Sequence, residues 1–193
     1  MRARTKAAAQ IAYITLGAMF GALLFISQIV LAGLPNIELV SLFIIVWTRV
    51  YRSGALWGIA VFVLLEGLLY GFGIWWISYL YIWLILWGLV MLVPPSRRPV
   101  EGKRRILASL GWALLSGAYG FSFGALTAIP WFFRGGPASA FAYWVSGIPF
   151  DISHAAGNFA AALLLAVPLI HLLEKLKAKA GTATRIPPPP QPS

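Results

Sequence analysis

Apolar residues run along this chain in long stretches, separated by short breaks that contain polar residues, glycine or proline. A helix that crosses a bilayer needs about 20 predominantly apolar residues. The pattern therefore predicts an all-α integral membrane protein folded as a bundle of six transmembrane helices. The predicted helices cover residues 7–31, 37–50, 54–72, 74–93, 106–133 and 149–173.

Proline and glycine mark most of the predicted helix ends. Pro35, Pro95 and Pro137 each follow an apolar stretch, and proline disfavours the continuation of a helix. The segment 138–147 is apolar but too short to span, so we expect an interfacial or re-entrant piece there. The chain then divides into a basic N-terminus at 1–6, a six-helix transmembrane domain at 7–174, and a basic, Pro-rich disordered tail at 175–193.

Charged residues are few and unevenly placed. They make up 10% of the chain, against about 25% in an average soluble domain, which argues against an ordinary soluble enzyme. If the N-terminus is inside and six helices alternate, 14 of the 15 lysines and arginines fall in inner segments, and Arg134 falls outside. Because positive charge resists translocation, both termini are predicted to be cytoplasmic. The net charge of +10 then reflects membrane topology and implies no nucleic-acid partner.

Three acidic residues fall in the predicted outer half of the bundle, where a charge is costly and therefore suggests function. These are Glu38, Glu66 and Asp151. Asp151, His154 and Asn158 are spaced i, i+3, i+7, so they share one face of the last helix. That face would form the polar wall of an outward-facing cavity. The alternative is a helix N-terminus stabilised by Asp151, with the other two side chains bonded to neighbouring helices.

Aromatic side chains are concentrated at the same predicted outer end. An interfacial belt of Trp and Tyr occurs in any membrane protein, but here the outer side carries far more rings than the inner side. Rings combined with a few acids and amides suit a flat, polar heterocycle. The candidate aromatic residues are Trp75, Trp76, Tyr79, Trp131, Tyr143 and Trp144.

Small residues form two overlapping pairs on the first predicted helix. Gly17 and Gly21 form one pair, and Ala18 and Ala22 form the other, each four positions apart. Small residues at this spacing let two helix backbones approach closely. The partner is either another helix of this bundle or another membrane protein.

The chain lacks the sequence signatures of most enzymes. It contains no cysteine and no P-loop, and Ser146 lacks the flanking glycine pattern of a nucleophile elbow. The two histidines, His154 and His171, are 17 positions apart on one predicted helix and cannot share a metal ion. We therefore expect a protein that is not an enzyme and has no cofactor and no metal site. A binding subunit that takes its energy from partners fits this pattern.

Several stretches resemble the substrate-binding (S) components of energy-coupling factor transporters. One is Pro35-Asn36-Ile37-Glu38-Leu39-Val40-Ser41, which looks like the start of the second helix in that family. The others are residues 64–67 with 70–76, and residues 146–151 with His154 and Asn158. The resemblance covers roughly residues 8–173.

This resemblance implies a function. Such proteins lie in the bacterial or archaeal cell membrane as multi-pass proteins and capture a vitamin or a vitamin precursor from outside. They deliver it through a transmembrane coupling protein that carries two ATPase subunits. The pair Ala18 and Ala22 matches the family's docking motif in position, and Asn36 joins the candidate residues for binding the ligand.

Two other functions remain open at this stage. A membrane scaffold of the rod-shape type has a similar six-helix bundle, but it would leave Asp151, His154 and Glu66 without a role. A membrane enzyme acting on lipid would need a reactive cluster near one interface. The pair Asp151 and His154 is the one candidate for such a cluster, and it has no nucleophile or metal partner.

Overall fold

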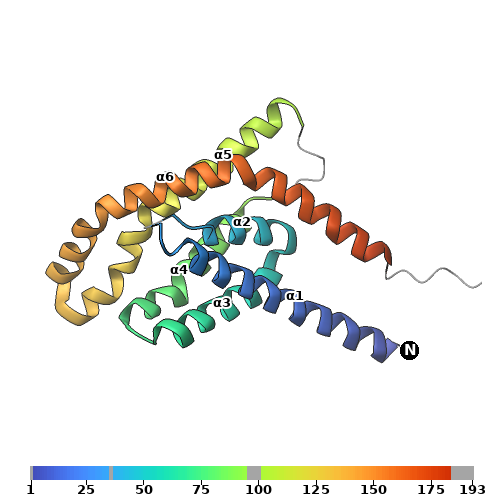
Figure 1. Cartoon of the computed structure of the whole chain (residues 1–193), viewed down its shortest axis with the longest axis horizontal. Coiled ribbons are helices and arrows are strands. Elements are labelled where there is room, and N and C mark those ends of the chain that lie inside the picture. Colours follow the sequence, from blue (N-terminus) through green and yellow to red (C-terminus); the bar gives the residue numbers. More distant parts are fainter. Residues whose placement is uncertain (1, 35–36, 95–100, 184–193) are drawn as a thin grey trace, which may run out of the picture.

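The computed structural model describes residues 2–34, 37–94 and 101–183, with side chains from residue 10 to residue 180 of these ranges. Within them the chain is all-helical and contains no strand, which confirms the predicted fold class. The elements are α1 (Arg2–Leu31), α2 (Val40–Tyr51), the 3₁₀ turn η1 (Arg52–Gly54), α3 (Ala55–Tyr70), α4 (Ile74–Leu92), α5 (Lys103–Thr127) and α6 (Ile129–Ala183) (Figure 1).

Five helical stretches of the described chain are long and apolar enough to cross a membrane, so this is a multi-pass membrane protein. Four of them correspond to α1, α4, α5 and α6, and the fifth joins α2, η1 and α3. The predicted count of six is therefore not reproduced by length and composition. The reason is α2, which has only 12 residues and would be about 18 Å long.

The largest departure from the predicted boundaries lies between α5 and α6. Helix α5 ends at Thr127 instead of residue 133, and α6 begins at Ile129 instead of residue 149. Gly135 and Gly136 interrupt α6 with non-helical backbone angles, and Gly136 has a φ of 75° that glycine adopts readily. Pro137 then suits the first turn of the resumed helix, where no N–H is needed.

The resumed helix covers two segments that the sequence analysis placed outside the six predicted helices. Residues 138–147, expected as an interfacial or re-entrant piece, are helical. Helix α6 also continues to Ala183, through the first part of the tail expected to be disordered at 175–193. Residues 186–193 lie outside the described chain.

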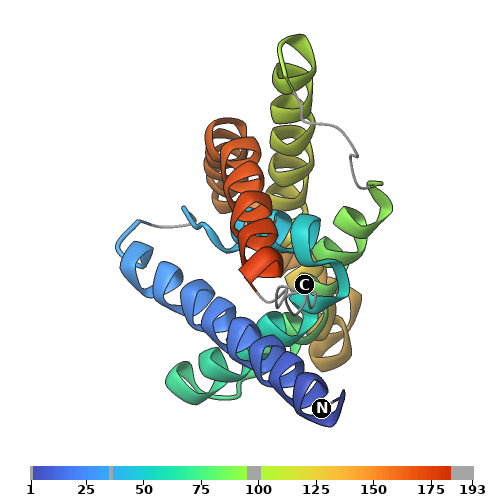
Figure 2. The ribbon, with the colours of Figure 1, turned by 90° about the vertical axis from the view of Figure 1, so that its right-hand side faces the viewer.

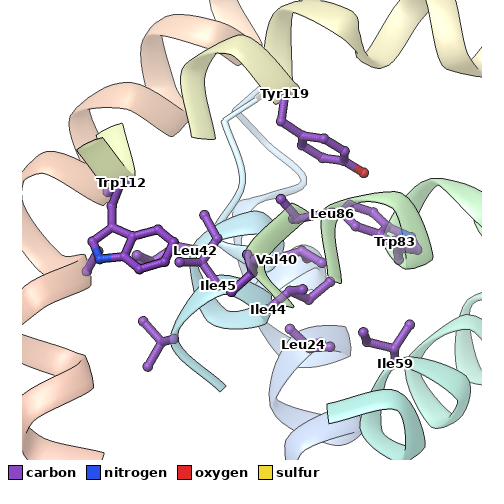
Figure 3. Packing of buried hydrophobic residues seen from close by; sticks show 14 of the residues in the cluster. Leu24, Val40, Leu42, Ile44, Ile45, Ile59, Trp83, Leu86, Trp112 and Tyr119 are labelled. Atoms are coloured by element: carbon purple, nitrogen blue, oxygen red, sulfur yellow. The ribbon is translucent and has the colours of Figure 1, made fainter. Parts of the chain in front are cut away.

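Helix α2 lies at the centre of the fold and contacts every other α-helix. Eight of its 12 residues are buried. Figure 3 shows Leu42, Ile44 and Ile45 of α2 among side chains from other helices, including Leu24 and Trp112. Seen end-on in Figure 2, α1 passes on one side of the molecule, while α5 and α6 rise on the other.

Basic side chains bind the carbonyl groups that helix ends leave without partners. Arg52 donates to Met91 O at 2.6 Å and to Val93 O at 3.2 Å at the end of α4. Lys177 Nζ donates to Val50 O at 2.7 Å near the end of α2 and lies 4.9 Å from the centre of the Tyr51 ring. These contacts hold the ends of α2, α4 and α6 together. Arg52 has a φ of 56°, unusual for a residue with a side chain, so this turn is strained.

Helices α1 and α3 approach closely through glycine. A Cβ atom at Gly21 would lie 2.7 Å from Gly58 O and 2.6 Å from Val61 Cβ, and one at Gly58 would lie 3.0 Å from Gly17 O. A Cβ at Gly17 would clash with the Trp57 ring. Gly17 and Gly21 are therefore used inside the bundle, as one of the two alternatives anticipated. Ala18 is exposed and Ala22 is half-buried.

The α1–α3 contact leads to a first prediction. Substituting Gly21→Ala should lower stability in detergent by about 1–3 kcal/mol, because the methyl group meets the backbone of α3 and the two helices must separate. Thermal unfolding followed by circular dichroism measures the change. Gly111→Ala is the control, since a Cβ there meets nothing within 4 Å. An equal response from the two variants would show that α1 and α3 do not pack through these glycines.

Candidate functional site

A polar contact between two side chains far apart in sequence joins Glu38 to His154. Glu38 lies just before α2, where its Oε2 accepts the Ser41 N–H at 2.8 Å and so satisfies an N–H at the start of this helix. Its other oxygen, Oε1, lies 3.1 Å from Nε2 of His154 on α6. The side chains of Glu38 and His154 are 13% and 6% exposed. A pair 116 positions apart in sequence thus fixes the start of α2 against α6.

The charge state of Glu38 follows from its surroundings. Burial raises the pKa of the Glu38 carboxyl, but hydrogen bonds from His154 and Ser41 and the positive charge that His154 can carry act in the opposite direction. Together they hold this pKa below its usual value. Glu38 is therefore an ionised acceptor at neutral pH.

Asp151 and Asn158 lie one turn before and one turn after His154 on the same face of α6. They are 5% and 1% exposed. Asp151 Oδ1 accepts the Gly124 N–H of α5 at 2.9 Å, while Asp151 Oδ2 has no partner, and neither has Asn158 Nδ2. A Cβ at Gly124 would clash with the Asp151 carboxylate, so glycine is what lets α5 lie against this acid.

A second polar group joins α1, α3 and α4. Gln28 Nε2 donates to Glu66 Oε2 at 3.1 Å and lies 3.4 Å from the hydroxyl of Tyr79. Glu66 is 1% exposed, and its Oε1 has no partner. One carboxylate oxygen of Glu66 is thus bonded by a neutral amide, and the other is buried and unbonded.

Aromatic rings connect the two polar groups. Tyr79 meets Trp83 edge to face at 5.4 Å between ring centres, Trp83 lies 5.8 Å from Phe123, and Phe123 lies 4.8 Å from the ring of His154. Trp83 is 1% exposed and its Nε1 has no partner. Figure 3 shows Trp83 between α4 and the Tyr119 side chain of α5. Glu66 and Asp151 therefore lie at two ends of one continuous polar and aromatic core, which we call the buried polar core. Its members are Gln28, Glu38, Glu66, Tyr79, Trp83, Phe123, Asp151, His154 and Asn158.

Several predicted site residues lie elsewhere. Trp131 and Tyr143 stack on each other at 5.1 Å near the kink of α6, with Arg134 over the Trp131 ring, and Trp144 is exposed beside Phe141. Trp76 donates its Nε1–H to Val63 O and packs on α3. Trp75 touches the core through Tyr79 at 5.2 Å. Asn36 lies outside the described residues.

Sequence reasoning missed three residues of the buried polar core. Gln28 was visible as one of two glutamines inside the first apolar stretch. Trp83 belongs to the same run of aromatic residues as the candidates Trp75 and Tyr79 but was not among the candidates. Phe123 gave no signal, because an aromatic residue in an apolar stretch is ordinary in a membrane protein. Their positions depend on how α4 and α5 face α6.

The described side chains contain no group of three or more histidines and acids that could hold a metal ion. No protein-family model, no curated protein and no solved structure matches this chain. The buried polar core must therefore be interpreted from its own chemistry.

The Glu38–His154 pair leads to a second prediction. His154→Ala should lower stability by about 1–3 kcal/mol, because it leaves the Oε1 atom of a largely buried carboxylate without its partner. A double-mutant cycle with Glu38→Gln, followed by thermal unfolding in detergent, measures the coupling between the two residues. We expect the double variant to lose clearly less than the two single losses added together. Strict additivity would mean that the two side chains do not stabilise each other.

Proposed function

We propose that this protein is the membrane-embedded, substrate-binding subunit of an importer of the energy-coupling factor type, and that it captures a vitamin or a vitamin precursor. The observation that carries this proposal is the buried polar core. It contains four buried polar atoms without partners: Glu66 Oε1, Trp83 Nε1, Asp151 Oδ2 and Asn158 Nδ2. In a membrane protein each such atom is costly, so their presence around aromatic rings favours a ligand site over a purely structural core.

The proposal includes six membrane crossings with both termini inside. In this arrangement α2 and α3 cross separately, with η1 at the inner surface, and 14 of the 15 basic residues are cytoplasmic. Figure 1 supports it, because the chain reverses direction at η1 and α2 and α3 both extend to the same side of this turn. Glu38, Glu66 and Asp151 then lie toward the outer side, where the ligand arrives.

The chain would depend on partners for energy. Its sequence has no P-loop, so ATP hydrolysis by that route would fall to two ATPase subunits that act through a transmembrane coupling protein. The exposed face of α1 offers a contact surface for that coupling protein. Ala18 lies on it, whereas Gly17 and Gly21 are already occupied by α3.

Ligand capture is tested directly by native mass spectrometry of the full-length protein, expressed in rich medium and purified in detergent. We expect one retained compound of vitamin size, lost in Asp151→Asn and kept in Glu101→Gln. Glu101 is an exposed acid before α5 and so provides the matched control. An empty wild-type protein that also ignores a panel of vitamins would contradict the proposal and favour a scaffold.

Topology is tested by single cysteines, which are unique here because the chain has none of its own. Ala138→Cys should react with a membrane-impermeant maleimide in intact cells, and Ser53→Cys only after permeabilisation. Both positions are exposed in the fold. If Ser53→Cys stays unreactive in permeabilised cells, residues 40–70 form one crossing and the six-crossing arrangement is wrong.

A further inference from the structure

Acidic side chains outnumber basic ones in the buried polar core. The carboxyl groups of Glu38, Glu66 and Asp151 are accompanied by a single basic side chain, that of His154. His154 bonds to Glu38. The hydrogen bonds that reach the other two acids come from neutral donors, the Gln28 amide and the Gly124 backbone N–H. A buried acid without a positive partner favours its neutral form, so Glu66 and Asp151 become carboxylates where a positive charge is brought to them.

The atoms without partners have a definite chemistry. Glu66 Oε1 and Asp151 Oδ2 are acceptors, so each calls for an N–H or O–H donor. Trp83 Nε1 and Asn158 Nδ2 are donors, so each calls for an acceptor. All four side chains are at least nine-tenths buried, and among the described residues no protein group satisfies these atoms.

Aromatic rings lie between the two acids. Tyr79, Trp83 and Phe123 form a continuous series of ring contacts between the Glu66 group and His154. Aromatic faces attract cations, and Trp does so most strongly. Flat rings also stack on such side chains, whereas an aliphatic or highly hydrated cation gains less from them.

We propose that the ligand of the buried polar core is a flat, cationic heteroaromatic molecule. It carries N–H or O–H donors for Glu66 and Asp151, and a ring nitrogen or oxygen that accepts from Trp83 or Asn158. The positive charge compensates the two carboxylates that lack one. This inference rests on the proposed function, because it assumes that the buried polar core takes a ligand.

The other charge classes fit the core less well. A neutral heterocycle would satisfy the hydrogen bonds but would supply no positive charge to stabilise Glu66 and Asp151 in their ionised form. An anion would be repelled by either acid in its ionised form, because like charges at short range in a medium of low dielectric repel strongly. We therefore expect the affinity of the core to depend more on the charge of the ligand than on its other properties.

The test compares probes of the same ring and different charge, using the full-length protein in detergent at fixed ionic strength. The matched set is 1-methylnicotinamide (cation), nicotinamide (neutral) and nicotinate (anion), extended by thiamine, riboflavin and folate as larger members of the three classes. Binding is measured by isothermal titration calorimetry and by thermal shift. The charge of any compound retained in native mass spectrometry is determined in parallel.

We expect cations to bind more tightly than the neutral and anionic members, and any retained compound to be a cation. Glu66→Gln and Asp151→Asn should each weaken cation binding by about tenfold or more, because a charged hydrogen bond is replaced by a neutral one. Glu101→Gln should bind as the wild type does. The amide variants keep the shape of the acids, and circular dichroism verifies that they are folded.

The alternative outcomes are distinct. A neutral or anionic ligand that binds more tightly than the cations, or cation binding that both amide variants leave unchanged, overturns the charge inference while the proposed function stands. A wild-type protein that retains no compound and binds no probe overturns both.

Discussion

Helix α2 is too short to cross a bilayer unaided, and much of the structure follows from this. Its 12 residues reach about 18 Å, whereas the hydrocarbon layer is about 30 Å thick. Each of the other α-helices contacts it, and eight of its residues are buried among them. Just before the helix Ile37 is exposed, but the Glu38 side chain reaches into the bundle and meets His154 there.

Local pattern was enough to predict the helices but not how they join. The apolar stretches predicted α1, α3 and α4 to within a few residues, apart from the first turns of α1, because length and hydropathy are properties of the segment itself. Gly135 and Gly136 do separate two helices, as the sequence indicated. The predicted start of the last helix was wrong, because helical backbone resumes at Pro137 instead of residue 149.

The candidate site, like the fold, was predictable where the signal is local and not where it depends on packing between helices. The spacing of Asp151, His154 and Asn158 predicted a shared face, and all three are buried. That His154 meets Glu38, and that Phe123 separates it from Trp83, depends on packing between helices far apart in sequence. From the sequence, Trp131, Tyr143 and Trp144 were candidates of the same kind as Tyr79, because all four are aromatic residues at the predicted outer end. They lie instead around the kink of α6, which no local signal distinguished from the buried polar core.

The length of α6 has a mechanical consequence. From Pro137 to Ala183 a straight helix would measure about 70 Å, more than twice the hydrocarbon thickness of a bilayer. One crossing uses less than half of it, so its remaining turns lie in the headgroup layers or in water. His154 lies along this rod, away from both of its ends. At this point α6 is bonded to the start of α2. A small change in the tilt of α6 there would displace both distant ends of the helix by larger distances.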